Sequence, residues 1–177
     1  MSVVLYIVFI LLTGGERIVE LVVSKRNAAL AMSQGGREYG QRHFPWMVTL
    51  HTGFLLACIA EVVLLGRPFI PVLGWPMLVI ALFCQAGRYW VIRSLGPQWN
   101  TRVIVIPGAQ RVTARGLYRV MTHPNYVIVA VEGVALPLVH TAWITALVFT
   151  VLNAVLLLGF RIPTEDKALR ELVRAAG

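Results

Sequence analysis

Charged side chains are scarce in this sequence, and their scarcity excludes an ordinary soluble domain. Only 14% of the 177 residues are Asp, Glu, Lys or Arg, whereas 58% are hydrophobic, and the mean hydropathy is +0.74. A soluble domain of this size has too little interior to hide so much apolar surface. We therefore predict a single integral membrane domain over residues 1–177, with its core shared between helix contacts and lipid.

Cysteine is nearly absent, and the common cofactor motifs are missing. Cys58 and Cys84 both fall inside apolar stretches, so a disulfide framework is not expected. No Cys-x-x-Cys or His-Glu-x-x-His occurs, and the four histidines do not stand at helical ligand spacing, so no metal site is expected. The motifs of phosphate-binding loops, dinucleotide-binding folds and serine hydrolases are also missing.

Long apolar stretches are what the sequence has instead. Each is near the ~20 residues that a helix needs to cross hydrocarbon. They cover residues 2–23, 46–66, 69–93, 120–139 and 141–161. The pattern predicts an all-α, polytopic bundle of about five transmembrane helices. The fourth stretch is the weakest, since Pro124 and Pro137 bracket only 14 residues; we expect a short or tilted helix, or half of a hairpin with the fifth.

Basic residues are unevenly divided among the connections. Four Lys or Arg residues follow the first stretch, one follows the second, six end or follow the third, none follows the fourth and four close the chain. Cytoplasmic segments are enriched in Lys and Arg, so this alternation predicts an N-terminus outside and a C-terminus in the cytoplasm. Membrane topology and contact with anionic lipid headgroups therefore explain the net charge of +8 better than nucleic-acid binding does.

Several ionisable residues lie within or beside the apolar stretches, where charge is costly. They are Glu16, Arg17, Glu20, His51, Glu61, Arg88 and Glu132. We expect structural pairing for most of them. Arg17 and Glu20 share a helical face, and Glu61 and Arg88 lie on neighbouring helices. The alternative is that such groups mark a functional site.

A polar segment, His123-Pro-Asn-Tyr126, leads into the fourth stretch. Proline suits the first helical turn, and the free N–H groups of that turn attract a polar or negatively charged ligand. The alternative is a plain loop whose His or Asn caps the helix.

Arg161 and Glu165 stand four residues apart where the last stretch meets the cytoplasm. Both project from one face if the helix continues through Pro163. The alternative to a site is structural: Arg161 anchors the helix end by extending its side chain to the membrane surface, and Glu165 is solvated. A cation and a carboxylate converging with the His123 helix start would suit a zwitterionic, nucleoside-like ligand.

The C-terminal half carries an ordered series of short motifs. They are Arg93-Ser-Leu-Gly96, Gly116-Leu-Tyr-Arg119, His123-Pro-Asn-Tyr126, and Arg161 with Glu165-Asp166. The series resembles the isoprenylcysteine carboxyl methyltransferase family of multi-span, S-adenosylmethionine-dependent enzymes. Leu117 and Thr122 stand where family members usually have proline and arginine.

The N-terminal half adds motifs that are similar to one branch of that family. They are Ser24-Lys-Arg-Asn27, Gly35-Gly-Arg-Glu-Tyr-Gly40, His43-Phe-Pro45, Leu50-His51, Arg88-Tyr-Trp90 and Trp99-Asn-Thr101. This branch comprises small bacterial methyltransferases that accompany type III polyketide synthases and methylate alkylresorcinols or alkylpyrones. The resemblance implies a site on the cytoplasmic face of a bacterial cytoplasmic membrane.

The resemblance also implies a set of site residues. The S-adenosylmethionine site would comprise Gln110, Arg111, Val112, Thr113, Tyr118, His123, Pro124, Asn125, Tyr126 and Glu165. Arg161 would face the acceptor oxygen, with His123 or His51 as candidate base. Arg161 and His123 are thus the expected catalytic residues, and Arg161 and His51 the expected acceptor-binding residues.

The implied reaction is methyl transfer to an oxygen of a lipophilic acceptor, leaving S-adenosylhomocysteine. A phenolic or enolic hydroxyl is preferred, because the branch-level likeness is better. Carboxyl methylation of an isoprenylcysteine-like thioether acid is the nearest alternative. A small transporter or membrane scaffold is the alternative from another class; the absence of internal repeats and the concentration of polar motifs on one side argue against it.

Overall fold

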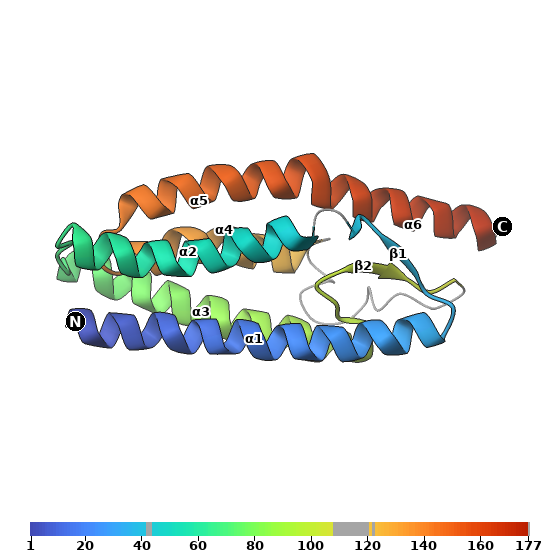
Figure 1. The fold of residues 1–177 in the computed structure, drawn as a ribbon, viewed down its shortest axis with the longest axis horizontal. Coiled ribbons are helices and arrows are strands. Elements are labelled where there is room, and N and C mark those ends of the chain that lie inside the picture. Colours follow the sequence, from blue (N-terminus) through green and yellow to red (C-terminus); the bar gives the residue numbers. More distant parts are fainter. Residues whose placement is uncertain (42–43, 108–120, 122, 177) are drawn as a thin grey trace.

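The computed structural model describes residues 1–41, 44–107, 121 and 123–176. The α-helices are α1 (Val3–Ser33), α2 (Phe44–Leu64), α3 (Pro71–Leu95), α4 (Pro124–Leu138), α5 (Trp143–Leu156) and α6 (Ile162–Ala176). They run along the long axis of the molecule (Figure 1). The two chain ends lie at opposite ends of that axis.

Helix boundaries follow the local chemistry of the sequence. Ser2 caps α1 by accepting a hydrogen bond from the Leu5 N–H at 3.3 Å. Proline opens both α3 and α4, at Pro71 and Pro124, where its missing N–H leaves no bond unmade. α3 ends at Gly96, whose φ of 52° is easy only for glycine, and a short 3₁₀ turn, η2 (Gly96–Gln98), follows.

α5 passes without a break into α6 through a π-helical turn, η4 (Leu157–Arg161). Pro163 lies just beyond this turn, at the start of α6. A proline inside an α-helix removes one hydrogen bond and crowds the preceding turn, and the wider π turn accommodates both effects. The helix therefore does continue through Pro163, the condition under which Arg161 and Glu165 were predicted to project from one face.

Two short strands form a small sheet that the all-α prediction lacked. β1 (Arg37–Tyr39) pairs antiparallel with β2 (Val103–Val105), with Glu38 opposite Ile104. Three residues a strand are too few to show a period-two pattern in the sequence. Gly36 fixes the approach to β1, because a Cβ there would lie 2.6 Å from the Ala31 carbonyl oxygen.

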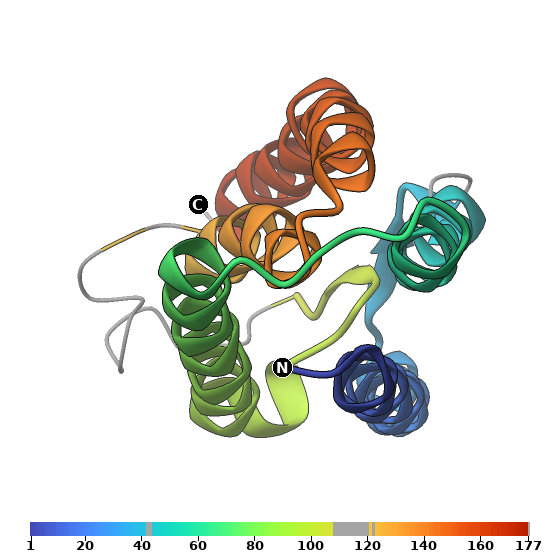
Figure 2. The ribbon, with the colours of Figure 1, turned by 90° about the vertical axis from the view of Figure 1, so that its left-hand side faces the viewer.

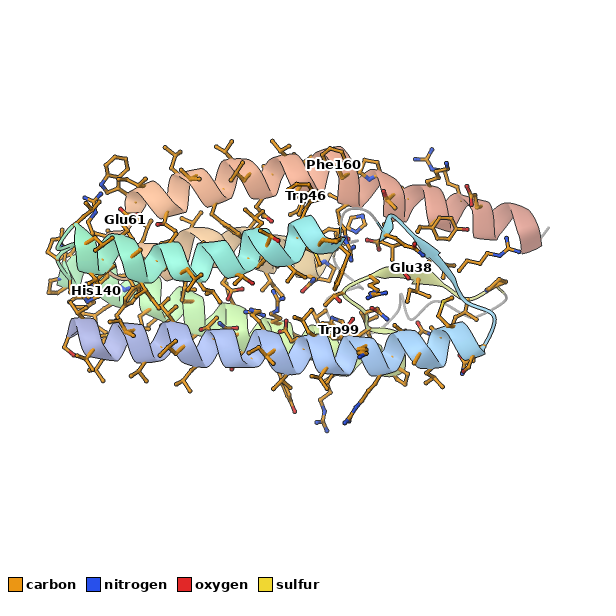
Figure 3. All side chains as sticks on the ribbon, viewed as in Figure 1. Glu38, Trp46, Glu61, Trp99, His140 and Phe160 are labelled. Atoms are coloured by element: carbon orange, nitrogen blue, oxygen red, sulfur yellow. The ribbon has the colours of Figure 1, made fainter. Side chains whose placement is uncertain are left out.

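The helices pack around a core that lies toward the end opposite the strands. α4 contacts α3 on one side and α5 on the other, while α2 contacts both α5 and α1 (Figure 2). Tyr6, Leu136 and Val139 are fully buried there, and the Tyr6 hydroxyl donates to the Leu136 carbonyl at 3.2 Å. Figure 3 shows Glu61 and His140 toward this end and Glu38 and Trp99 toward the strand end.

All five predicted apolar stretches form helices in the described residues. Three helical segments are long and apolar enough to cross a membrane: Phe44–Leu64, Pro71–Gln98 and Trp143–Ala168. Pro124–Leu138 is apolar but shorter, and it packs against α5 as the hairpin prediction expected. Full crossing by α1 and α4, and the direction of insertion, remain predictions.

The expected pairing of buried charges is confirmed for Arg17 with Glu20 but wrong for Glu61 with Arg88. Arg17 does pair with Glu20, at 2.7 Å. Glu61 does not pair with Arg88. It lies near the far end of α2, where it binds Arg67 at 2.9 Å and accepts from the Thr145 N–H at 2.7 Å, which caps the start of α5. Arg88 lies near the strand end of α3, too far along the bundle to reach it.

Candidate functional site

A cavity of about 730 Å³ occupies the half of the bundle beside the strands. Its walls come from α1, α2, the end of α3, β2, the start of α4 and the α5–η4–α6 rod. The volume lies in the range of ~300–1,000 Å³ typical of small-molecule sites. Pro97, Gln98 and Arg102 line it and are exposed beside the strands, so the cavity reaches the surface there.

The start of α4 supplies one polar wall of the cavity. His123 occupies the N-cap position, but its side chain makes no capping hydrogen bond. The ring instead stacks on Tyr126, with centroids 5.3 Å apart. Both ring nitrogens face carboxylates, Nδ1 lying 3.8 Å from Glu165 and Nε2 lying 3.9 Å from Asp166. The predicted helix start is therefore confirmed, and the capping alternative does not describe it.

Glu165 and Arg161 meet this helix start from the α5–η4–α6 rod. The Tyr126 hydroxyl donates to Glu165 Oε2 at 2.6 Å and also contacts the Arg161 guanidinium. Arg161 is buried, with 8% of its surface exposed, and its Nη2 donates to the Thr101 carbonyl. Two helices far apart in sequence thus place a cation, a carboxylate, a phenol and an imidazole in one corner of the cavity.

The Thr101 carbonyl that holds Arg161 is itself fixed to α1. Ser24 Oγ lies 2.6 Å from Thr101 Oγ1 and accepts from the Thr101 N–H at 3.0 Å. It also bonds to Asn100 Oδ1 at 2.7 Å. Asn27 completes the link by donating to the Trp99 carbonyl at 2.7 Å. The motifs Ser24–Asn27 and Trp99–Thr101 therefore form one scaffold behind the guanidinium.

His51 enters the cavity from α2. Its Nδ1 lies 2.9 Å from the Met47 carbonyl, which only accepts, so Nδ1 carries the hydrogen and Nε2 is left to accept a proton. The ring packs edge-on against Phe149, with centroids 5.4 Å apart. The residue is thus held in one orientation on the wall of the cavity.

A network of buried charges crosses the cavity from α1 to α3 and α4. Arg17 donates to Glu132 at 2.6 Å and to Gln85 at 2.9 Å, and Arg88 donates twice to Glu20, at 2.7 and 2.8 Å. Two cations and two carboxylates leave the network neutral, as a charge cluster in a membrane requires.

Buried polar atoms that lack a hydrogen-bond partner gather on this cavity. Within the described residues they are Arg88 Nη1, Asn125 Oδ1, Asn153 Oδ1 and Arg161 Nε. All four residues line the cavity. Arg88 Nη1 still lies 3.7 Å from Glu132. Buried polar groups are normally satisfied, so this concentration points to a polar ligand with both donors and acceptors.

The structure brings together most of the described residues that the sequence assigned to the site. His123, Asn125, Tyr126, Arg161, Glu165 and His51 all line the one cavity. Pro124 is buried behind them as the first residue of α4. Five expected cofactor residues lie outside the described residues and remain predictions: Gln110, Arg111, Val112, Thr113 and Tyr118.

Sequence reasoning missed three residues that shape the cavity. Thr101 and Ser24 stood inside quoted motifs, but no local pattern shows that they support Arg161. Asn153 was missed altogether, because a single amide side chain within an apolar stretch does not by itself indicate a site. Its position four residues from Phe149 and eight from Arg161 was the available signal.

Comparison with known proteins places the chain among methyltransferases. Residues 77–171 match the isoprenylcysteine carboxyl methyltransferase (ICMT) family, which confirms the resemblance seen in the sequence. The chain is also similar to the "uncharacterized protein YpbQ" of Bacillus subtilis (strain 168). The two are 40% identical over 157 residues, which cover 88% of this chain and 91% of that protein. No solved structure matches.

Proposed function

The chain belongs to the isoprenylcysteine carboxyl methyltransferase family, and on that premise we propose that it transfers a methyl group to an oxygen of a lipophilic acceptor. The family and the three long apolar helices make it an integral membrane protein. They support methyltransferase activity in general, and the methyltransferases of this family use S-adenosylmethionine.

The hydrogen-bonding groups that line the cavity beside the strands match those of the cofactor. S-adenosylmethionine carries an ammonium group, ribose hydroxyls and a carboxylate. Glu165 and the unpartnered Asn125 Oδ1 accept hydrogen bonds, while backbone N–H groups at the start of α4 offer donors. We assign cofactor binding to this corner, with His123 and Tyr126 forming a stacked wall. The bound cofactor supplies a methyl group activated by a positively charged sulfur.

Arg161 is the residue that we assign to the acceptor oxygen. A phenol has a reference pKa of about 10, so it needs a cation that favours its oxyanion or a base that takes its proton. Arg161 offers its unpartnered Nε, and the Thr101 carbonyl and Tyr126 fix the guanidinium. A dry, aligned site then favours a transfer in which charge is neutralised.

His51 is the better placed of the two candidate bases. Its Nε2 is the nitrogen left to accept a proton, and its ring lies on the cavity wall. Both nitrogens of His123 already face carboxylates. We therefore assign proton uptake from the acceptor hydroxyl to His51, and cofactor binding to His123.

The acceptor that we favour is the phenolic or enolic hydroxyl of an alkylresorcinol or alkylpyrone. Asn153 supports a hydroxyl over a carboxylate, because its unpartnered Oδ1 needs a donor that an ionised carboxylate lacks. The site would face the cytoplasm of a bacterial cell, since the basic residues concentrate at the strand end with the C-terminus.

The observation that carries this proposal is the contact of the α4 start with Arg161 and Glu165. Purified protein in detergent should transfer labelled methyl from S-adenosylmethionine to 5-pentadecylresorcinol. Arg161→Ala should lower turnover by roughly a hundredfold or more while cofactor affinity stays within about twofold. Equal turnover in wild type and Arg161→Ala, or transfer only to a thioether carboxylate, would contradict the assignment.

A further inference from the structure

The cavity has a second opening, onto the apolar surface between α1 and α2. At this opening, five residues that line the cavity are exposed: Leu11, Gly15 and Ile18 on α1, with Thr52 and Leu56 on α2. Leu11, Ile18 and Leu56 are 63%, 65% and 64% exposed. The α1 positions follow an i, i+4, i+7 spacing and the α2 positions an i, i+4 spacing, so each helix contributes one edge. Because α2 is long and apolar enough to cross a membrane, this opening faces lipid.

Glycine keeps that opening wide. A Cβ at Gly15 would meet nothing within 4 Å, and one at Gly14 would meet only Leu55 Cδ1, at 3.6 Å. Two glycines in a helix interior weaken the helix. Here they leave open space on α1 directly beside the cavity.

Asn153 supplies a polar group on the apolar side of the same cavity. It is 2% exposed, and its Oδ1 has no partner in the described residues. Its neighbours one turn away on α5, Phe149 and Leu157, are apolar. The amide oxygen accepts hydrogen bonds, so it matches a hydroxyl of a ligand.

Asn153 and Arg161 are spaced to hold two groups of one ligand. They are eight residues apart on a continuous helix, which corresponds to about 12 Å along its axis. Both side chains line the cavity, so one ligand can contact both.

We propose that the membrane-side half of the cavity binds a single-chain amphiphile: a ring with two oxygens lies between Arg161 and Asn153, and its alkyl chain leaves between α1 and α2 past Gly15. This inference rests on the proposed function and assigns its acceptor site. Asn153 selects for the second oxygen, and the Gly15 opening selects for one unbranched chain.

Ligand binding tests whether the alkyl chain leaves the cavity past Gly15, without requiring turnover. Wild-type protein in nanodiscs is titrated with 5-pentadecylresorcinol, using tryptophan fluorescence because Trp99 lines the cavity. Gly15→Leu fills the opening and lowers affinity at least fivefold. Gly53→Leu is the matched control: it adds the same side chain to α2, meets nothing within 4 Å and lies away from the cavity, so it binds like wild type. Equal losses in the two variants, or none in Gly15→Leu, overturn the chain exit.

A pair of ligands tests the role of Asn153. Asn153→Leu should lower affinity for 5-pentadecylresorcinol about tenfold, the loss expected when one buried hydrogen bond is removed. It should lower affinity for 3-pentadecylphenol, which lacks the second hydroxyl, less than twofold. Thr150→Val, on the same helix but with its hydroxyl bonded to Ala146, is the control. Equal losses for both ligands mean a structural role and overturn the assignment.

The same titrations separate this inference from the proposed function. If the binding pattern holds but no labelled methyl is transferred, the acceptor site stands and the methyltransferase proposal fails. If methyl transfer occurs while Gly15→Leu and Asn153→Leu bind like wild type, the enzyme proposal stands and the acceptor site is overturned. Failure of the wild type to bind either ligand also overturns the acceptor site.

Discussion

A backbone carbonyl and the Tyr126 hydroxyl position the Arg161 guanidinium. The Thr101 carbonyl that accepts from it is held by Ser24, whose hydroxyl contacts Thr101 twice and Asn100 once. A guanidinium held by a neutral group keeps its full charge available for an acceptor oxygen. Ser24, on a different helix from Arg161, is therefore expected to matter for turnover.

Ser24→Ala tests this support. The substitution leaves the Thr101 N–H without its acceptor and frees the 99–101 segment to shift. We expect kcat to fall roughly ten- to hundredfold, because small displacements of a catalytic group are costly, while affinity for S-adenosylhomocysteine changes less than about twofold. Ser33→Ala, at the exposed end of the same helix, is the control. A loss of cofactor affinity equal to the loss of kcat would mean that Ser24 supports the fold at large.

Single residues were predictable where a local pattern carried their chemistry. The i, i+4 spacing of Arg161 and Glu165 and the proline at the α4 start sufficed to predict that they converge. Ser24 and Asn153 were not predictable, because their roles depend on which helices become neighbours. The wrong prediction for Glu61 has the same cause. The order of the helices in the sequence does not show at which level along the bundle a side chain lies.

Among the helices, α1 is held to α3 and α4 by charges at the level of the cavity. Arg17 and Glu20 on α1 reach Gln85 and Arg88 on α3 and Glu132 on α4. A neutral network of this kind fixes the relative positions of helices, and removal of one charge leaves another uncompensated. The network therefore sets the width of the cavity.

Glu132→Gln tests the network through stability. The loss of one carboxylate leaves an excess cation, at a cost of about 3–5 kcal/mol, which lowers the Tm in detergent by about 10 °C. Glu16→Gln is the control, since Glu16 is an exposed carboxylate on the same helix as Arg17 and Glu20. Exposed charges contribute at most about 1 kcal/mol. Similar Tm values for the two variants would contradict a stabilising role for the network.

Helices were predictable as elements and strands were not. The five apolar runs predicted α1 to α5, because a run long enough to cross lipid is a clear signal, whereas α6 lies beyond the last run. β1 and β2 are three residues each and pair across more than 60 intervening positions, so no local period reveals them. The sequence raised the possibility that the helix continues through Pro163, and the structure shows that a π turn precedes this proline.

The molecule as a whole is asymmetric along its long axis. One end carries the short connections and the tight core of Tyr6, Leu136 and Val139. The other carries the strands, most of the basic residues and the cavity, with one opening beside the strands and one between α1 and α2. This arrangement suits a reaction between a water-soluble cofactor and a lipid-soluble acceptor.

Calorimetric titration of the purified protein with S-adenosylhomocysteine tests the central claim most directly, because a transporter or scaffold has no reason to bind it. We predict saturable binding of about one equivalent, weakened roughly tenfold or more by Glu165→Ala, which removes a charged acceptor from the cavity. Glu16→Ala, on the exposed face of α1, should bind like wild type. No binding by the wild type, or equal binding by wild type and Glu165→Ala, would contradict a cofactor site at the start of α4.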